Sequence, residues 1–74
     1  MFSIGDKVRL SEAARQEFLT SANNSSYSKV AQQNRIGTVI EQVGVRGRHL
    51  VIAYLVDFDS VRMTIPEEDL VRVQ

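Results

Sequence analysis

The segment HLVIAYLVDF, residues 49–58, has apolar side chains on both faces of a predicted strand. Successive side chains of a strand point to opposite faces, so a strand with one wet face should alternate apolar and polar residues. The even-numbered face is apolar throughout: Leu50, Ile52, Tyr54, Val56 and Phe58. The odd-numbered face carries Val51, Ala53 and Leu55 and turns polar only at Asp57. We therefore expect the even face to fill the core and the odd face to be covered by another surface.

Four further segments show the two-residue period of a strand. Together with the first they predict five strands, at about 6–10, 36–43, 48–58, 61–65 and 70–73. Pro66 ends the fourth strand because it has no N–H to donate, and the residues PEED that it opens are typical of a tight 3₁₀ turn. Short strands joined by tight turns favour a small, strongly bent antiparallel barrel, since an open sheet leaves its edges unprotected.

A helix is predicted between the first two strands, over about residues 11–19. Ser11 offers an oxygen to cap its first turn, where Glu12 also suits the helix dipole. Ala14 and Phe18 share a face at the i, i+4 spacing. A helix of two to three turns is held by docking of this apolar face rather than by its intrinsic propensity.

Residues 20–34 are rich in Ser, Asn and Gln and predict a long polar surface loop. A loop of this length is unusual in so small a domain, and such loops are often functional or disordered. Tyr27 and Val30 are its only large apolar residues, and Tyr27 could contact a partner or fold back over the end of the barrel.

The composition describes one small globular domain, residues 1–74, with nine basic and nine acidic residues. Proteins that coat nucleic acid are usually basic, so a net charge of zero argues against that role. The absence of cysteine excludes disulfides and thiolate chemistry. The first ten residues lack the pattern of a signal peptide, and no apolar run approaches the roughly 20 residues of a membrane span. We expect a cytoplasmic protein without a cofactor.

Candidate catalytic residues are sparse. His49 is the only histidine, and no second nitrogen or sulfur ligand accompanies it, so we expect no metal site. No signature places it beside a nucleophilic serine or threonine, and a carboxylate pair would need a cleft that a small barrel rarely has room to build. The sequence therefore favours a function without catalysis.

The order of motifs resembles that of SH3-like small barrels. IGDKVRL matches their first strand, RIGTVIEQV their second, YLVDFD the end of their third, and IPEEDLVRV the turn into their last. RIGTV is also similar to the core of a KOW motif, whose glycine permits a tight bend. The layout is similar to short uncharacterised proteins of bacteriophages and prophages. The resemblance implies a five-stranded barrel that binds proteins or nucleic acid; the aromatic groove that proline-rich peptides require is absent.

Protein binding is the leading hypothesis, with another protein or a second copy of the chain as the partner. An exposed apolar patch on the outer face of the third strand would carry it, with Tyr27 from the polar loop. The patch residues are Val51, Ala53 and Leu55. The alternative is that the helix covers this face with Phe18 and Leu19. A small neutral protein of phage type could also inhibit a host factor.

Nucleic-acid binding of the KOW type is the second hypothesis. Basic residues gather in one part of the chain: Lys29, Arg35, Arg46, Arg48 and His49. Glycines near the two arginines of the 44–49 turn would let a phosphate approach the backbone, and a solvated hairpin tip explains the same residues. The acidic triplet 67–69 could dock a basic partner, but we favour the simpler interpretation that it solvates a turn and suits the dipole at its N-terminal end.

Overall fold

The computed structural model describes residues 1–20, 25–45, 51–59 and 61–73, with the backbone alone for residues 25, 26, 45 and 51. Its elements, in chain order, are β1 (Lys7–Leu10), α1 (Glu12–Thr20), α2 (Ser25–Gln33), β2 (Gly37–Val45), β3 (Val51–Asp57), β4 (Arg62–Pro66), the 3₁₀ turn η1 (Glu67–Asp69) and β5 (Leu70–Arg72). The predicted five strands, first helix and 3₁₀ turn are confirmed, with ends that differ by up to three residues.

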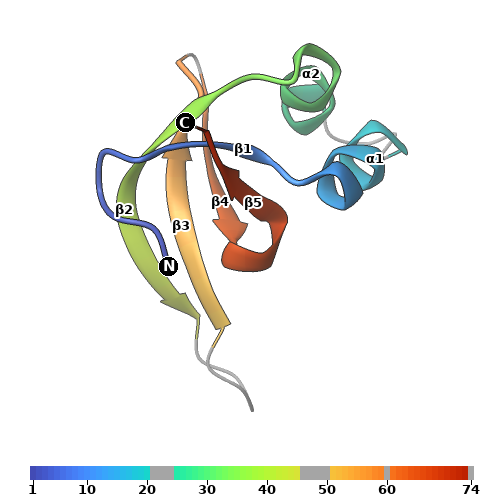
Figure 1. Ribbon diagram of the computed structural model, residues 1–74. Coiled ribbons are helices and arrows are strands. Elements are labelled where there is room, and N and C mark those ends of the chain that lie inside the picture. The colour runs from blue at the N-terminus through green and yellow to red at the C-terminus, as the bar shows by residue number, and fades with distance from the viewer. Residues whose placement is uncertain (21–24, 46–50, 60, 74) are drawn as a thin grey trace.

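The strands form one antiparallel sheet in the order β4-β3-β2-β1-β5 (Figure 1). Of the predicted antiparallel barrel, the structure shows the five-stranded antiparallel sheet, which is not closed and has β4 and β5 as its two edges. Pro66 ends β4, and η1 follows directly. This turn leads the chain from one edge strand, β4, to the other, β5. The sheet bends strongly at a bulge in β2, where the register shifts between Val39 and Glu41.

Helix α1 begins where its cap predicts. The side-chain oxygen of Ser11 accepts a hydrogen bond of 3.2 Å from the N–H of Ala14, as an N-cap residue does. Ala14 is buried, and Phe18 and Leu19 are partly buried against the same core. The apolar face identified in the sequence is thus the face that docks.

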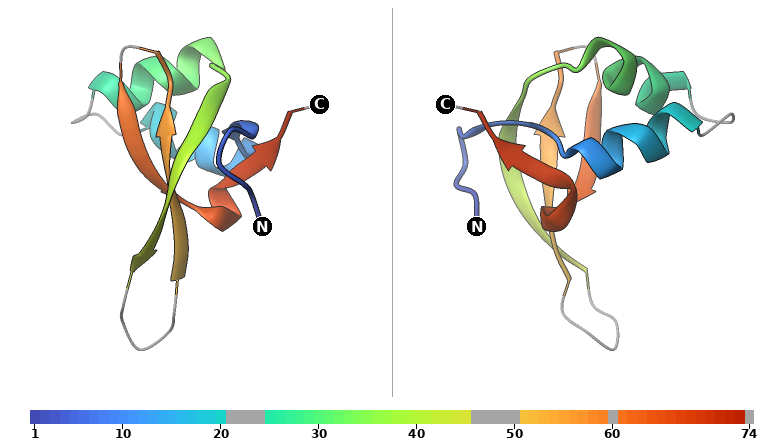
Figure 2. Two further views of the ribbon diagram at one scale, coloured as in Figure 1. Left: turned by 90° about the vertical axis from the view of Figure 1, so that its left-hand side faces the viewer. Right: turned by 45° about the vertical axis from the view of Figure 1, so that its right-hand side comes forward.

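The polar loop predicted at residues 20–34 is wrong, because residues 25–33 form helix α2. Val30 and Ala31 lie one helical turn from Tyr27, and both are buried within the core. Three apolar side chains on one face are enough to hold this helix once a second helix packs against it. That support comes from α1, which lies beside α2 in all views (Figure 2).

Side-chain contacts hold the two helices together. The rings of Phe18 and Tyr27 meet edge to face, 5.0 Å apart, an arrangement favoured by aromatic quadrupoles. Arg15 Nε donates a 2.8 Å hydrogen bond to the carbonyl of Ala31, and Ser28 Oγ donates one of 3.3 Å to the carbonyl of Phe18. The polar composition of α2 therefore serves the pairing of helices and not a solvated loop.

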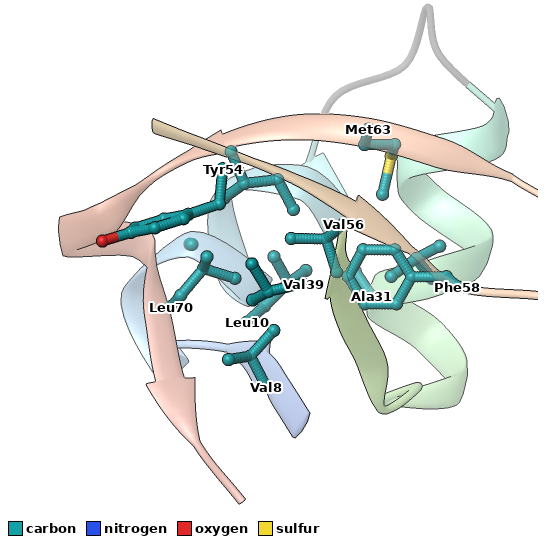
Figure 3. Packing of buried hydrophobic residues seen from close by; sticks show 12 residues of the cluster. Val8, Leu10, Ala31, Val39, Tyr54, Val56, Phe58, Met63 and Leu70 are labelled. Carbon is teal, nitrogen blue, oxygen red and sulfur yellow. The ribbon is translucent and has the colours of Figure 1, made fainter. Parts of the chain in front are cut away.

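One hydrophobic core joins the helices to the sheet (Figure 3). Tyr54, Val56 and Phe58 of the even-numbered face have no exposed surface, which confirms this face as the core face. Ala31 of α2 lies near Phe58 at one end of the core, and Tyr54 lies toward the other. The helices thus cap one end of the bent sheet, and the opposite end is bounded by the N-terminal segment and η1 (Figure 1).

Candidate functional site

A groove of about 570 Å³ lies at the end of the sheet away from the helices. It is lined by Met1, Phe2, Ile52, Pro66, Glu67, Glu68 and Leu70. Most of these side chains are apolar; the two glutamates supply negative charge, and the amino group of Met1 supplies one positive charge. A concave apolar surface with a few polar groups is the usual form of a binding site.

Tyr54 connects the two walls of the groove, which are the N-terminal segment and η1. Its ring is fully buried and packs edge to face on Phe2, with 5.4 Å between ring centres. Its hydroxyl accepts a 3.0 Å hydrogen bond from the N–H of Phe2 and donates one of 2.8 Å to Oε2 of Glu67. A single buried oxygen therefore fixes the backbone of one wall and the carboxylate of the other.

The hydroxyl of Tyr54 has a perturbed acidity. The N–H of Phe2 lowers the pKa of Tyr54, but burial and the nearby carboxylate of Glu67 outweigh it, and the pKa lies above its usual value of 10. The phenol therefore stays protonated at neutral pH and keeps donating to Glu67.

The N-terminal wall is held by a second set of contacts. Arg72 places its guanidinium 5.6 Å from the ring centre of Phe2, within the range of a cation–π interaction. The same group donates to the carbonyl of Met1 at 3.1 Å and to Oδ2 of Asp6 at 3.0 Å. Asp6 Oδ2 also accepts from the N–H of Ser3 at 2.8 Å. These bonds fold the first six residues back over β5.

Protonation of Asp6 should loosen this wall. The N–H of Ser3, assisted by Arg72, holds the pKa of Asp6 below its ordinary value of 3.8. Asp6 therefore stabilises the fold above that value, and its contribution is lost as the pH falls through the lower pKa of the folded protein. We expect Asp6→Asn to lower the melting temperature at neutral pH, and the difference from wild type to shrink as the pH falls below 3.8 and through the lower pKa of the folded protein. A melting-temperature difference that does not depend on pH would contradict this origin.

The electrostatic character of the groove is acidic. Glu67 lies 3.6 Å from the amino group of Met1 and Glu68 is exposed, and no ion pair of Glu68 is found within the described residues. Both belong to η1, where Pro66 starts a turn that presents successive side chains to solvent. From the sequence, the acidic triplet 67–69 could be a docking spot or a solvated turn. In the structure, two of its carboxylates line a concave surface.

The predicted patch on β3 lies elsewhere. Leu55 is partly exposed and Ala53 is buried, and neither belongs to the core cluster or packs against it. The alternative that α1 covers this face does not hold for these two residues, because Phe18 and Leu19 pack against the core on the opposite face. The side chain of Val51 lies outside the described part of the chain. Tyr27 is partly buried between the helices.

The structure does not gather the predicted basic residues into one described site. Arg35 donates a 3.3 Å hydrogen bond to the carbonyl of Phe58 and another to the side chain of Gln33, so it takes part in the fold. Lys29 is exposed on α2. Arg46, Arg48 and His49 lie outside the described residues.

Sequence reasoning did not predict the groove. The charge of the 67–69 triplet next to Pro66 was noted, but nothing in the sequence placed it beside Phe2. Phe2 precedes the first strand and has no periodic partner, so its contact with Tyr54 comes from the folding of the chain. Ile52 was assigned to the core face, and it lines the groove because that face continues past the end of the core.

Within the described residues, no group of three or more potential ligands is arranged to hold a metal ion. None of the helices seen there is long and apolar enough to cross a bilayer.

Comparisons with protein-family models, with curated proteins and with solved structures found no match for this chain.

Proposed function

We propose that this protein is a non-catalytic binding module that takes a short basic and apolar segment of a partner protein into the groove. The observation that supports this is the joining of an apolar concave surface to the carboxylates of Glu67 and Glu68. Phe2, Ile52 and Leu70 would receive an apolar side chain. The two glutamates would pair with Lys or Arg beside it, since charge-assisted hydrogen bonds are roughly twice as strong as neutral ones.

An extended peptide suits this groove better than a compact ligand. The lining comes from segments far apart in the sequence, namely the N-terminus, the start of β3 and η1, and the groove is open to solvent. Among the described residues, Phe2 is the one aromatic side chain that lines it, whereas recognition of proline-rich helices requires several. We therefore favour a basic peptide with an aliphatic or aromatic anchor.

The finer assignment of the fold also belongs to this proposal. We propose that the sheet is a partly open SH3-like barrel. Its first strand lies between β2 and the last strand, and a 3₁₀ turn leads into that last strand. The bulge in β2 supplies the strong bend that such a barrel needs.

Selection from a library of displayed random peptides tests the function. We expect the enriched peptides to carry Lys or Arg next to a large apolar residue. Binding of a selected peptide, measured by titration calorimetry, should weaken by about tenfold or more in the double variant Glu67→Gln/Glu68→Gln, a change of at least about 1.4 kcal/mol. Higher salt should weaken wild-type binding, since exposed charges are screened.

Glu17→Gln is the control, because it replaces a glutamate on α1, outside the groove, and so removes one negative charge where the double variant removes two. It should bind the selected peptide as wild type does. Glutamine can still accept from the hydroxyl of Tyr54, so the double variant should keep the fold. Enrichment of peptides without a cation, or equal binding by the double variant, would refute the proposal.

Fluorescence anisotropy with RNA and DNA oligonucleotides at low salt tests the second hypothesis, nucleic-acid binding. Tight binding that falls steeply with salt would favour a nucleic-acid partner. We expect no such binding at the groove, because it presents carboxylates where a phosphate would need cations.

A further inference from the structure

The outer face of β2, β3 and β4 is a second surface, separate from the groove. Strand register places Leu55 between Glu41 of β2 and Thr64 of β4. Ile40, the residue inserted at the bulge, and Val43 extend the apolar area along β2. All the apolar residues named here are partly exposed, and none packs against the hydrophobic core. Both helices contribute to the core on the other side of the sheet.

The charges on this face are arranged unevenly across the strands. Glu41 is exposed on the β2 side, and no ion pair of Glu41 is found in the described part of the chain. Arg62 is on the β4 side, with its side chain 66% exposed. Among the described residues it forms one ion pair, with Asp57 at 4.0 Å. The guanidinium has five N–H donors and can serve a second carboxylate.

We infer that this face binds a second copy of the chain in a two-fold face-to-face dimer. Two sheets that stack face to face keep their strands nearly aligned, about 10 Å apart. A two-fold axis along β3 places β2 of one copy over β4 of the other. Leu55 then meets its own symmetry mate, and Glu41 of each copy lies over Thr64 of the other. Arg62 is two residues from Thr64 on the same face of β4, so its long side chain can reach that Glu41 diagonally.

A two-fold axis could also run across the strands, and the charges favour the axis along β3 over that one. An axis across the strands would stack β2 on β2 and bring the two Glu41 carboxylates together, which is unfavourable. With the axis along β3, the two Asp57 carboxylates approach at one end of the contact, where each keeps its own Arg62 nearby. The small apolar area and this approach predict a weak dimer that forms with rising concentration.

Sedimentation equilibrium over an about 100-fold range of protein concentration tests the dimer. We expect wild type to shift from monomer to dimer and Leu55→Asp to stay monomeric. Glu41→Arg and Arg62→Glu should each weaken association. The double variant Glu41→Arg/Arg62→Glu should restore it, because the pair is re-formed with its signs exchanged.

The variants at Glu41 and Arg62 still test the dimer if Leu55→Asp fails to fold, since both residues are exposed. Glu17→Arg, with the same charge change on α1, should leave association unchanged. Wild type that stays monomeric, or a double variant that is not restored, would overturn the inference. A dimer lost on Thr64→Pro but indifferent to the charge variants would mean pairing of β4 edges and would overturn it as well. Peptide binding by the groove should be the same in all variants that fold, so the two proposals fail separately.

Discussion

Gly37→Ala should destabilise the protein by about 3 kcal/mol, the upper end of the usual cost of overpacking a core. A Cβ atom at this position would lie 2.5 Å from Cγ1 of Val56 and 2.8 Å from Cε1 of Phe58. Both are fully buried, so neither can move aside without disturbing the centre of the core. In a domain of this size such a loss lowers the melting temperature by roughly 12–24 °C.

Thermal unfolding followed by circular dichroism measures this effect, and Gly44→Ala is its control. Gly44 also lies in β2, but a Cβ atom there would have no neighbour within 4 Å. We expect Gly44→Ala to stay within about 0.5 kcal/mol of wild type. Equal melting temperatures for the two variants would show that the approach of β2 to Phe58 is looser than the structure indicates.

The glycine of RIGTV was identified from the sequence, and the structure gives its physical reason. The resemblance to a KOW motif implies a glycine that permits a tight bend. In the structure the bend lies further along, at the bulge after Val39, and Gly37 instead lets β2 pass close to the core. The strand itself was predictable from alternation alone, whereas the closeness of two segments far apart in sequence was not.

The failure at residues 25–33 has a different cause. Composition is a poor guide to a short helix, because its stability comes from docking and not from its own propensity. The chain pattern at Tyr27, Val30 and Ala31 had the spacing of one helical face, but three apolar residues among Ser and Gln do not stand out. Only the pairing with α1 makes that face sufficient.

The candidate site was partly predictable for a similar reason. The acidic triplet and Pro66 are adjacent in sequence, so their turn could be foreseen. The groove arises because the N-terminal segment folds back onto Tyr54 and Arg72, contacts that span 52 residues in one case and 71 in the other. No periodicity encodes such contacts.

Tyr54→Phe should cost about 2 kcal/mol, the loss expected when buried groups are left without a hydrogen-bond partner. The variant keeps the ring, so the core volume and the edge-to-face contact with Phe2 remain. It removes the oxygen that accepts from the N–H of Phe2 and donates to Glu67. Urea unfolding measures the change, with the slope against urea expected to stay constant because the exposed surface is unchanged.

A double-mutant cycle with Glu67→Ala shows whether the hydroxyl acts through the carboxylate. The two changes break one hydrogen bond, so the double variant should cost less than the sum of the single variants by about 0.5 kcal/mol or more. Strict additivity would mean that Tyr54 stabilises the fold through Phe2 alone. The selected peptide should also bind less tightly to Tyr54→Phe, since both walls of the groove lose their common anchor.

Alkaline pH gives an independent measure of the same hydroxyl. Because the pKa of Tyr54 is raised in the folded protein above 10, the unfolded chain loses this proton first as the pH rises. Wild type should therefore lose stability from about pH 10 upward, through the higher pKa of the folded state. Tyr54→Phe has no proton to lose there, so the two unfolding free energies should converge as the pH rises. A constant difference across this range would show that the hydroxyl is not confined in the folded state by burial and by Glu67.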